Sequence, residues 1–176
     1  MKIIFDEDKK YSKYKKYSLY FLLALLLNIF DLVLLDYLSL EGLTPDFLLI
    51  LVVWISLNEG QFIGMISGFI AGLMFDLFSF DVLGTNSLAK VIAALIAGWF
   101  YNQNKINENI GSYRFLVIIF VSSLFHNLVY FFMYIKVSEI SFLPFFGKYG
   151  LAISFYTTVF AIFPMLIRLP KNRLIR

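Results

Sequence analysis

The chain has 176 residues, of which 60% are hydrophobic and only 15% are charged, with a formal net charge of +3. Soluble domains average about 45–50% apolar and about 25% charged residues, so this composition excludes a soluble enzyme or nucleic-acid-binding domain and indicates an integral membrane protein. Cysteine is absent and histidine occurs once, which excludes disulfides, thiolate chemistry and a multi-histidine metal centre.

Six apolar stretches predict an all-α membrane protein with six transmembrane helices, since a helix needs about 20 residues to cross the hydrocarbon core. The predicted spans cover residues 17–38, 45–57, 61–80, 83–101, 113–135 and 148–167. The second span has 13 residues, or about 20 Å of helix, so a five-span arrangement with this segment re-entrant is the alternative. The first stretch is too long for a signal peptide and lacks a small-residue cleavage site, so we interpret it as a permanent helix.

The basic residues predict the orientation. With six spans, twelve of the fifteen Lys and Arg residues lie on one side, next to the first helix, the loop between the fourth and fifth helices, and the last helix. Only Lys136 and Lys148 lie on the other side, and Lys90 lies within the fourth span. The positive-inside rule therefore places both termini in the cytoplasm. We expect three regions: a basic N-terminal tail (1–16), a single six-helix transmembrane domain (17–167) and a basic C-terminal tail (168–176).

Polar residues occur at the expected outer side of the first two spans. Asp31 lies in the outer half of the first span. A charge at mid-bilayer costs about 2.5–3.5 kcal/mol, so this side chain must face the bundle or water. Thr44, Pro45 and Asp46 begin the second span. Thr44 is a favourable N-cap, Pro45 suits the first helical position, and Asp46 complements the helix dipole, which is a sufficient structural reason for all three.

The third span carries a glycine at every fourth position. Gly64, Gly68 and Gly72 would form a smooth ridge that another helix can approach closely. One interpretation is internal packing against the alanine-rich fourth span. The other is docking of a partner's membrane helix, either on this ridge or at the opening of the second span near Pro45 and Asp46.

Three further polar residues lie within the predicted spans, where a polar side chain needs a compensating partner. Asp76 lies near the end of the third span and Lys90 within the fourth, with a short turn between the two spans. We expect these two side chains to form a buried ion pair that either fixes the hairpin or lines a polar pocket. His126 and its neighbour Asn127 are interpreted as an interhelical hydrogen-bonding pair. No catalytic constellation, phosphate-binding loop or metal motif is present, so we expect neither enzymatic activity nor a cofactor.

The segment from the second to the fourth span has a distinctive order. Pro45-Asp46 begins an apolar helix, and a short charged turn, Asn58-Glu59-Gly60, follows it. A glycine-spaced helix then ends in Asp76, and Leu83-Gly84 precedes an alanine-rich helix. This order resembles the MreD family of bacterial rod shape-determining membrane proteins. The resemblance covers residues 40–102, and its most specific part runs from Gly72 through Asp76 to Gly84.

The resemblance implies a non-enzymatic protein of the bacterial cytoplasmic membrane that binds MreC, through its membrane helix and the adjacent region. It further implies a place in the elongation machinery with MreB, RodA and the elongation-specific penicillin-binding transpeptidase, either directly or through MreC. The role would be to organise or regulate lateral peptidoglycan synthesis and so to maintain rod shape. Membrane lipids are the other expected contacts, and no nucleic acid is expected.

Two other interpretations remain open. The substrate-binding (vitamin) subunits of energy-coupling-factor transporters have a similar size and six spans, and the MreD family resembles them in fold. Those subunits use small residues spaced by four in the first helix, which this chain lacks between Phe21 and Asn28. A vitamin pocket would draw on Asp31, Trp54, Asp76 and Asn86. The third interpretation, a small lipid enzyme built on Asp31 or His126, has no catalytic constellation to support it.

Overall fold

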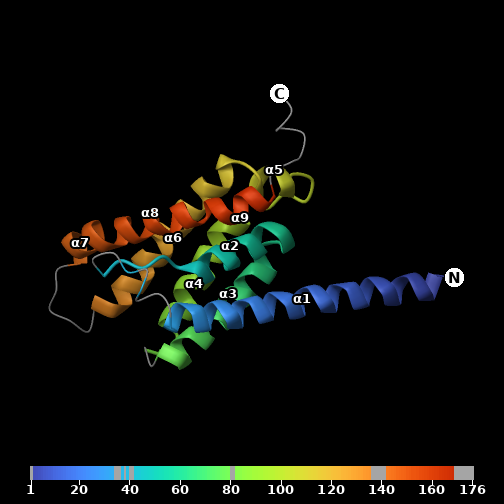
Figure 1. Ribbon diagram of the computed structural model, residues 1–176, viewed down its shortest axis with the longest axis horizontal. Coiled ribbons are helices and arrows are strands. Elements are labelled where there is room, and N and C mark those ends of the chain that lie inside the picture. Colours follow the sequence, from blue (N-terminus) through green and yellow to red (C-terminus); the bar gives the residue numbers. More distant parts are fainter. Residues whose placement is uncertain are drawn as a thin grey trace.

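The protein is described by a computed structural model that covers residues 2–33, 37, 39, 42–79, 82–135 and 142–168 (Figure 1). Within these ranges the chain forms helices and no β-strand, which confirms the all-helical prediction. The helices are α1 (Lys2–Val33), α2 (Phe47–Glu59), α3 (Gln61–Ser79), α4 (Thr85–Gly98), α5 (Ile106–Ile110), α6 (Tyr113–Ile135), α7 (Phe142–Phe145), a π-helical turn (Phe146–Gly150), α8 (Leu151–Phe160) and α9 (Ile162–Ile167).

Four helical segments are long and apolar enough to cross a membrane. They comprise residues 13–33 of α1, all of α3, residues 113–134 of α6, and the run from α7 through α9. The two other predicted spans correspond to α2 and α4, which have only 13 and 14 residues. Every predicted span therefore coincides with a helix, while the crossing of the membrane by all six stays a prediction.

The two short helices form the interior of the bundle. Eight residues of α2 and ten of α4 are buried, compared with five of the 19 residues of α3. Helix α4 packs against α3 on one side and α6 on the other, and α2 packs against both α3 and α4. Because protein covers most of their surface, α2 and α4 have little contact with lipid and need not match the bilayer thickness by themselves.

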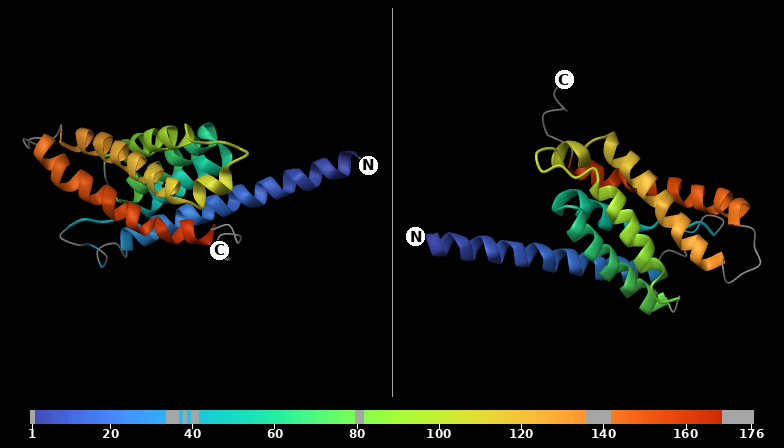
Figure 2. Two further views of the ribbon diagram at one scale, coloured as in Figure 1. Left: turned by 90° about the horizontal axis from the view of Figure 1, so that it is seen from above. Right: turned by 180° about the vertical axis from the view of Figure 1, so that it is seen from behind.

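Helix α1 extends far beyond the rest of the bundle at its N-terminal end, as Figures 1 and 2 show. The predicted basic tail is therefore helical from Lys2 and continuous with the first span. Near the middle of α1, Lys16 forms an ion pair with Glu59 at the end of α2, and the Tyr20 hydroxyl donates to the same carboxylate at 3.1 Å. Most of the predicted end of this span, residues 34–38, lies outside the described residues.

The last span begins earlier and is less regular than expected. Its helix begins at Phe142 and passes through the π-helical turn before α8. Helix α8 ends at Phe160, four residues before Pro164. Pro164 has no backbone N–H to donate to the carbonyl oxygen of Phe160, which accounts for the break between α8 and α9. Helix α5, in the loop before α6, was not predicted.

Candidate functional site

The glycine ridge of α3 is covered by the chain's own helices. A Cβ added at Gly68 would lie 2.9 Å from the backbone oxygen of Lys90, and one at Gly72 would lie 2.6 Å from the Cα of Ser87. At Gly64 an added Cβ would overlap the Ser56 side chain of α2. The ridge therefore allows α2 and α4 to approach the α3 backbone closely. This favours internal packing over the docking of a partner helix on these glycines.

Asp76 caps the N-terminus of α4. Its carboxylate accepts hydrogen bonds from the backbone N–H groups of Gly84 (2.9 Å), Asn86 (3.2 Å) and Ser87 (3.4 Å) and from the Ser87 hydroxyl (3.3 Å). Gly84, the N-cap residue, has a φ of +93° and no side chain that can cap the helix. The acid from α3 therefore takes the role of the missing cap, and its negative charge complements the helix dipole.

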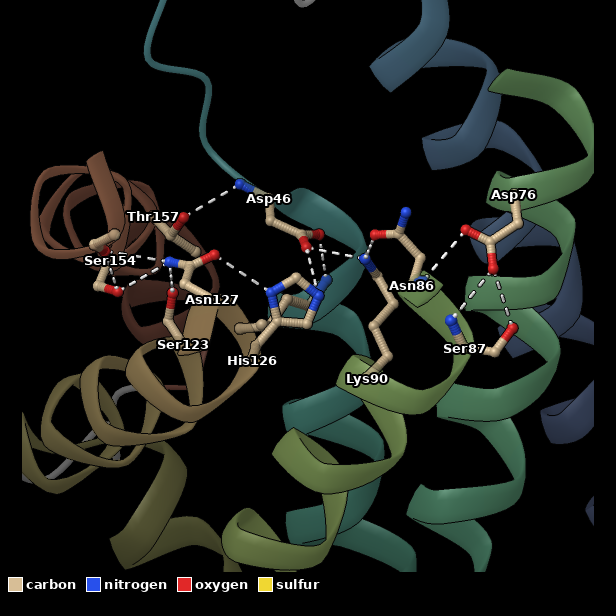
Figure 3. A network of polar contacts seen from close by, with 12 residues as sticks. Asp46, Asp76, Asn86, Ser87, Lys90, Ser123, His126, Asn127, Ser154 and Thr157 are labelled. Atoms are coloured by element: carbon tan, nitrogen blue, oxygen red, sulfur yellow. Dashed lines mark hydrogen bonds and ion pairs between the residues drawn. The ribbon is translucent and has the colours of Figure 1, made fainter. Parts of the chain in front are cut away.

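Lys90 forms its ion pair with Asp46. The Lys90 Nζ lies 2.8 Å from Oδ2 of Asp46 and 3.4 Å from Oδ1 of Asn86, and the lysine side chain is 2% exposed (Figure 3). The predicted pair between Asp76 and Lys90 is therefore wrong. The physical reason is that backbone donors of α4 occupy the Asp76 carboxylate, while the lysine extends toward the start of α2.

Asp46 connects three helices. It is the N-cap of α2, where its Oδ1 accepts the Leu49 N–H at 2.7 Å. Thr44 was expected in this role from the sequence, and that expectation is wrong. Its own backbone N–H donates to Oγ1 of Thr157 in α8 at 3.0 Å. With the Lys90 pair, Asp46 therefore joins α2 to α4 and to α8. Pro45, which precedes the cap, is buried, so the opening of α2 offers a partner little surface.

His126 and Asn127 connect α6 to the same cluster. The Nε2 of His126 lies 3.6 Å from Oδ2 of Asp46, and its Nδ1 lies 3.3 Å from Oδ1 of Asn127. The Asn127 amide donates to Oγ of Ser154 at 2.9 Å and to the backbone oxygen of Gly150 at 3.2 Å, both next to or within α8. Asn127 thus supplies the expected interhelical hydrogen bonds, while His126 faces the Asp46–Lys90 pair.

Asp31 reaches this cluster from α1. Its side chain is buried, with 8% of the residue exposed. Asp31, Asp46, Asn86, Lys90 and His126 line a cavity of about 160 Å³, together with aromatic side chains. We call these five residues the polar cluster. It joins residues from α1, α4 and α6 around the N-terminus of α2.

The transporter-type pocket considered from the sequence is only half present. Of its four residues, Asp31 and Asn86 line the cavity. Asp76 is turned to the α4 N-terminus, and Trp54 packs against Phe115 with a centroid separation of 5.9 Å. The Arg168 guanidinium also lies over the Trp54 ring, 5.1 Å from its centroid, in the second half of α2.

Sequence reasoning missed that Asp46 belongs to the polar cluster, since a helix cap explained it sufficiently. The signal that could have shown it is topological. With six spans, the start of the second span and the first turns of the fourth lie on the same side of the membrane, so Asp46 and Lys90 have similar depth. Within the described residues, no group of three or more His, Asp or Glu side chains is arranged to hold a metal ion.

The family model for the rod shape-determining protein MreD matches residues 13–171. No curated protein and no solved structure matches the chain.

Proposed function

The chain belongs to the MreD family of rod shape-determining proteins, and from this membership we propose that it is a non-enzymatic membrane scaffold of the bacterial elongation machinery. In this role it binds MreC and helps to organise lateral peptidoglycan synthesis by RodA and the elongation-specific penicillin-binding transpeptidase, with MreB on the cytoplasmic side. The family match over most of the chain is the observation that carries this proposal.

The ends of the helices support an arrangement with six spans and both termini in the cytoplasm. Lys16 near the middle of α1 pairs with Glu59 at the end of α2, and Arg168 after α9 donates to Oδ1 of Asn107 in α5 at 3.2 Å. Arg168 also covers the Trp54 ring in the second half of α2. These contacts gather the basic ends of the first and last helices at one end of α2, and the polar cluster surrounds its other end. A basic cytoplasmic face is the arrangement that the positive-inside rule favours.

The contact with MreC is proposed to involve lipid-facing side chains. The glycine ridge and the opening of α2 are occupied by the chain's own helices, as described above. Helix α3 instead exposes Phe62, Ile66, Phe69 and Ile70 on its outer face, with between 43% and 75% of each side chain accessible. Helices associate in lipid by close van der Waals packing, and such a face is available to a partner's single membrane helix.

Two measurements test the scaffold proposal. Depletion of this protein in its own bacterium should turn rods into rounded cells, and the wild-type protein should restore the rods. The affinity-tagged protein, solubilised from the same membranes, should co-purify with MreC. Photo-reactive residues placed at Ile66 or Phe69 should crosslink to the MreC membrane helix if the exposed face of α3 is the contact, while one at Leu143, 81% exposed on α7, serves as the matched control.

The result that would contradict the scaffold proposal is also defined. Unchanged cell shape on depletion, combined with co-purification of a vitamin and a transporter module, would favour the substrate-binding subunit of a transporter instead.

A further inference from the structure

Three buried polar atoms at one cavity have no hydrogen-bond partner in the protein. They are Oδ1 of Asp31, Nδ2 of Asn86 and Nε2 of His126. The three residues are 8%, 4% and 4% exposed, and all three line the cavity of about 160 Å³ within the polar cluster. A buried polar group without a partner costs about 1–3 kcal/mol. Three of them at one cavity indicate that a polar ligand completes this site.

The charges at the cavity indicate the sign of that ligand. Its titratable lining residues are Asp31 from α1, Asp46 from α2, Lys90 from α4, and His126 and Tyr130 from α6. Lys90 is committed to Asp46 at 2.8 Å, and the neutral imidazole and phenol add no charge. The Asp31 carboxylate therefore has no cation of its own. A carboxyl group this deep in a membrane protein is ionised only when an opposite charge lies beside it and is otherwise neutral, so the binding of a cation would be coupled to the ionisation of Asp31.

The geometry points to a ligand with a primary ammonium group and a nearby oxygen acceptor. We propose that the cavity binds such an aminoalcohol group, either as a free small amine or as the headgroup of an aminophospholipid. The ammonium donates to Oδ1 of Asp31 and Nε2 of His126, and the neighbouring oxygen accepts from Nδ2 of Asn86. Phe75 and Phe131 also line the cavity and suit the methylene groups of the ligand.

The size of the cavity agrees with a ligand of this kind. A single water needs about 10–15 Å³ of such volume, so about 160 Å³ accommodates a group of several heavy atoms. A quaternary ammonium has no N–H to donate and therefore fits the two acceptors poorly. A neutral diol of the same shape has donors but does not neutralise Asp31.

The test measures thermal unfolding of the full-length protein with added probes. Ethanolamine should raise the melting temperature of the detergent-solubilised protein, while ethylene glycol, its neutral counterpart, should not. For the lipid source, the protein is placed in nanodiscs of phosphatidylglycerol containing either phosphatidylethanolamine or phosphatidylcholine. A melting temperature that rises with phosphatidylethanolamine but not with phosphatidylcholine identifies the lipid headgroup as a ligand. A melting temperature that rises with free ethanolamine shows that the small amine is sufficient.

Variants make the test specific to the cavity. Asp31→Asn keeps nearly the same shape but cannot ionise, so it should weaken ethanolamine binding by about tenfold or more. Glu108→Gln, which neutralises an exposed carboxylate on α5, should leave binding unchanged. His126→Phe removes the second acceptor and provides an independent variant in case Asp31→Asn does not fold.

Two outcomes would overturn the proposal. Equal stabilisation by ethylene glycol and ethanolamine would show that the charge is not recognised. Binding of the amine with unchanged affinity by whichever of the two cavity variants folds would show that it binds elsewhere.

Discussion

Removal of the Lys90 ammonium tests the central ion pair most directly. In Lys90→Met the methylene stem of the side chain is largely kept, while Asp46 loses its cation in a site where the lysine is 2% and the aspartate 18% exposed. At 2.8 Å and an effective dielectric constant of about 20, the attraction between the two charges is about 6 kcal/mol. Desolvation offsets much of this attraction, so the net contribution of the pair to the free energy of unfolding is small. Removal of one partner, however, typically lowers the free energy of unfolding by about 3–5 kcal/mol.

The second step of this experiment restores neutrality. Asp46→Asn removes the negative charge but keeps a side-chain oxygen that can cap α2. The double variant Asp46→Asn/Lys90→Met should therefore recover most of the stability that Lys90→Met loses. Lys105→Met, which removes an exposed lysine, is the matched control and should change stability by less than about 0.5 kcal/mol.

Tryptophan fluorescence in detergent micelles is a suitable assay, because Trp54 packs against Phe115 in the core and should report loss of tertiary structure. The reasoning would be refuted if Lys90→Met were as stable as the wild type. It would also be refuted if the double variant were no more stable than Lys90→Met alone, since the cost would then not arise from an uncompensated carboxylate.

Three further predictions concern the packing of α3, the cap of α4 and the orientation in the membrane. Gly72→Ala should destabilise the protein by about 1–3 kcal/mol in thermal melts because its Cβ would lie 2.6 Å from Ser87, whereas Gly147→Ala, whose Cβ meets no atom within 4 Å, should be nearly neutral. Asp76→Ala leaves the α4 N-terminus without its cap and should cost about 1–3 kcal/mol, measured in the same way; an unchanged melt would contradict the cap. In this cysteine-free chain, Leu83→Cys should react with an impermeant thiol reagent added outside spheroplasts, and Gln103→Cys only after the membrane is opened. The reverse pattern would contradict the proposed orientation.

The apolar pattern predicted the helices well because lipid imposes a simple requirement on the backbone. Each crossing segment must satisfy its own N–H and C=O groups, so long apolar stretches become helices whatever their partners. This is why α3 and α6 begin at the predicted residues, Gln61 and Tyr113. Glycine spacing similarly indicated close packing at α3, although it did not say which helix would lie on the ridge.

The partners of the buried charges could not be predicted in the same way. Spacing along the chain placed Asp76 and Lys90 on adjacent helices at similar depth, and this suggested a pair. The direction of each side chain depends on local donors that the pattern does not reveal, above all the free N–H groups at the start of α4. Asp46 and Lys90 are 44 residues apart, and Asp46 and Thr157 are 111 apart, so only the three-dimensional packing brings them together.

The connections of Asp46 also have a consequence for the biogenesis of the protein. Helix α2 is made early, but the Thr157 hydroxyl that receives the Asp46 N–H is synthesised 111 residues later. At about 5–20 residues per second, that interval lasts roughly 6–22 s. During this time α2, which begins with the Asp46 carboxylate, is without its contact to α8. Nascent chains stalled before α8 should therefore expose α2 to proteases and chaperones that the finished bundle excludes.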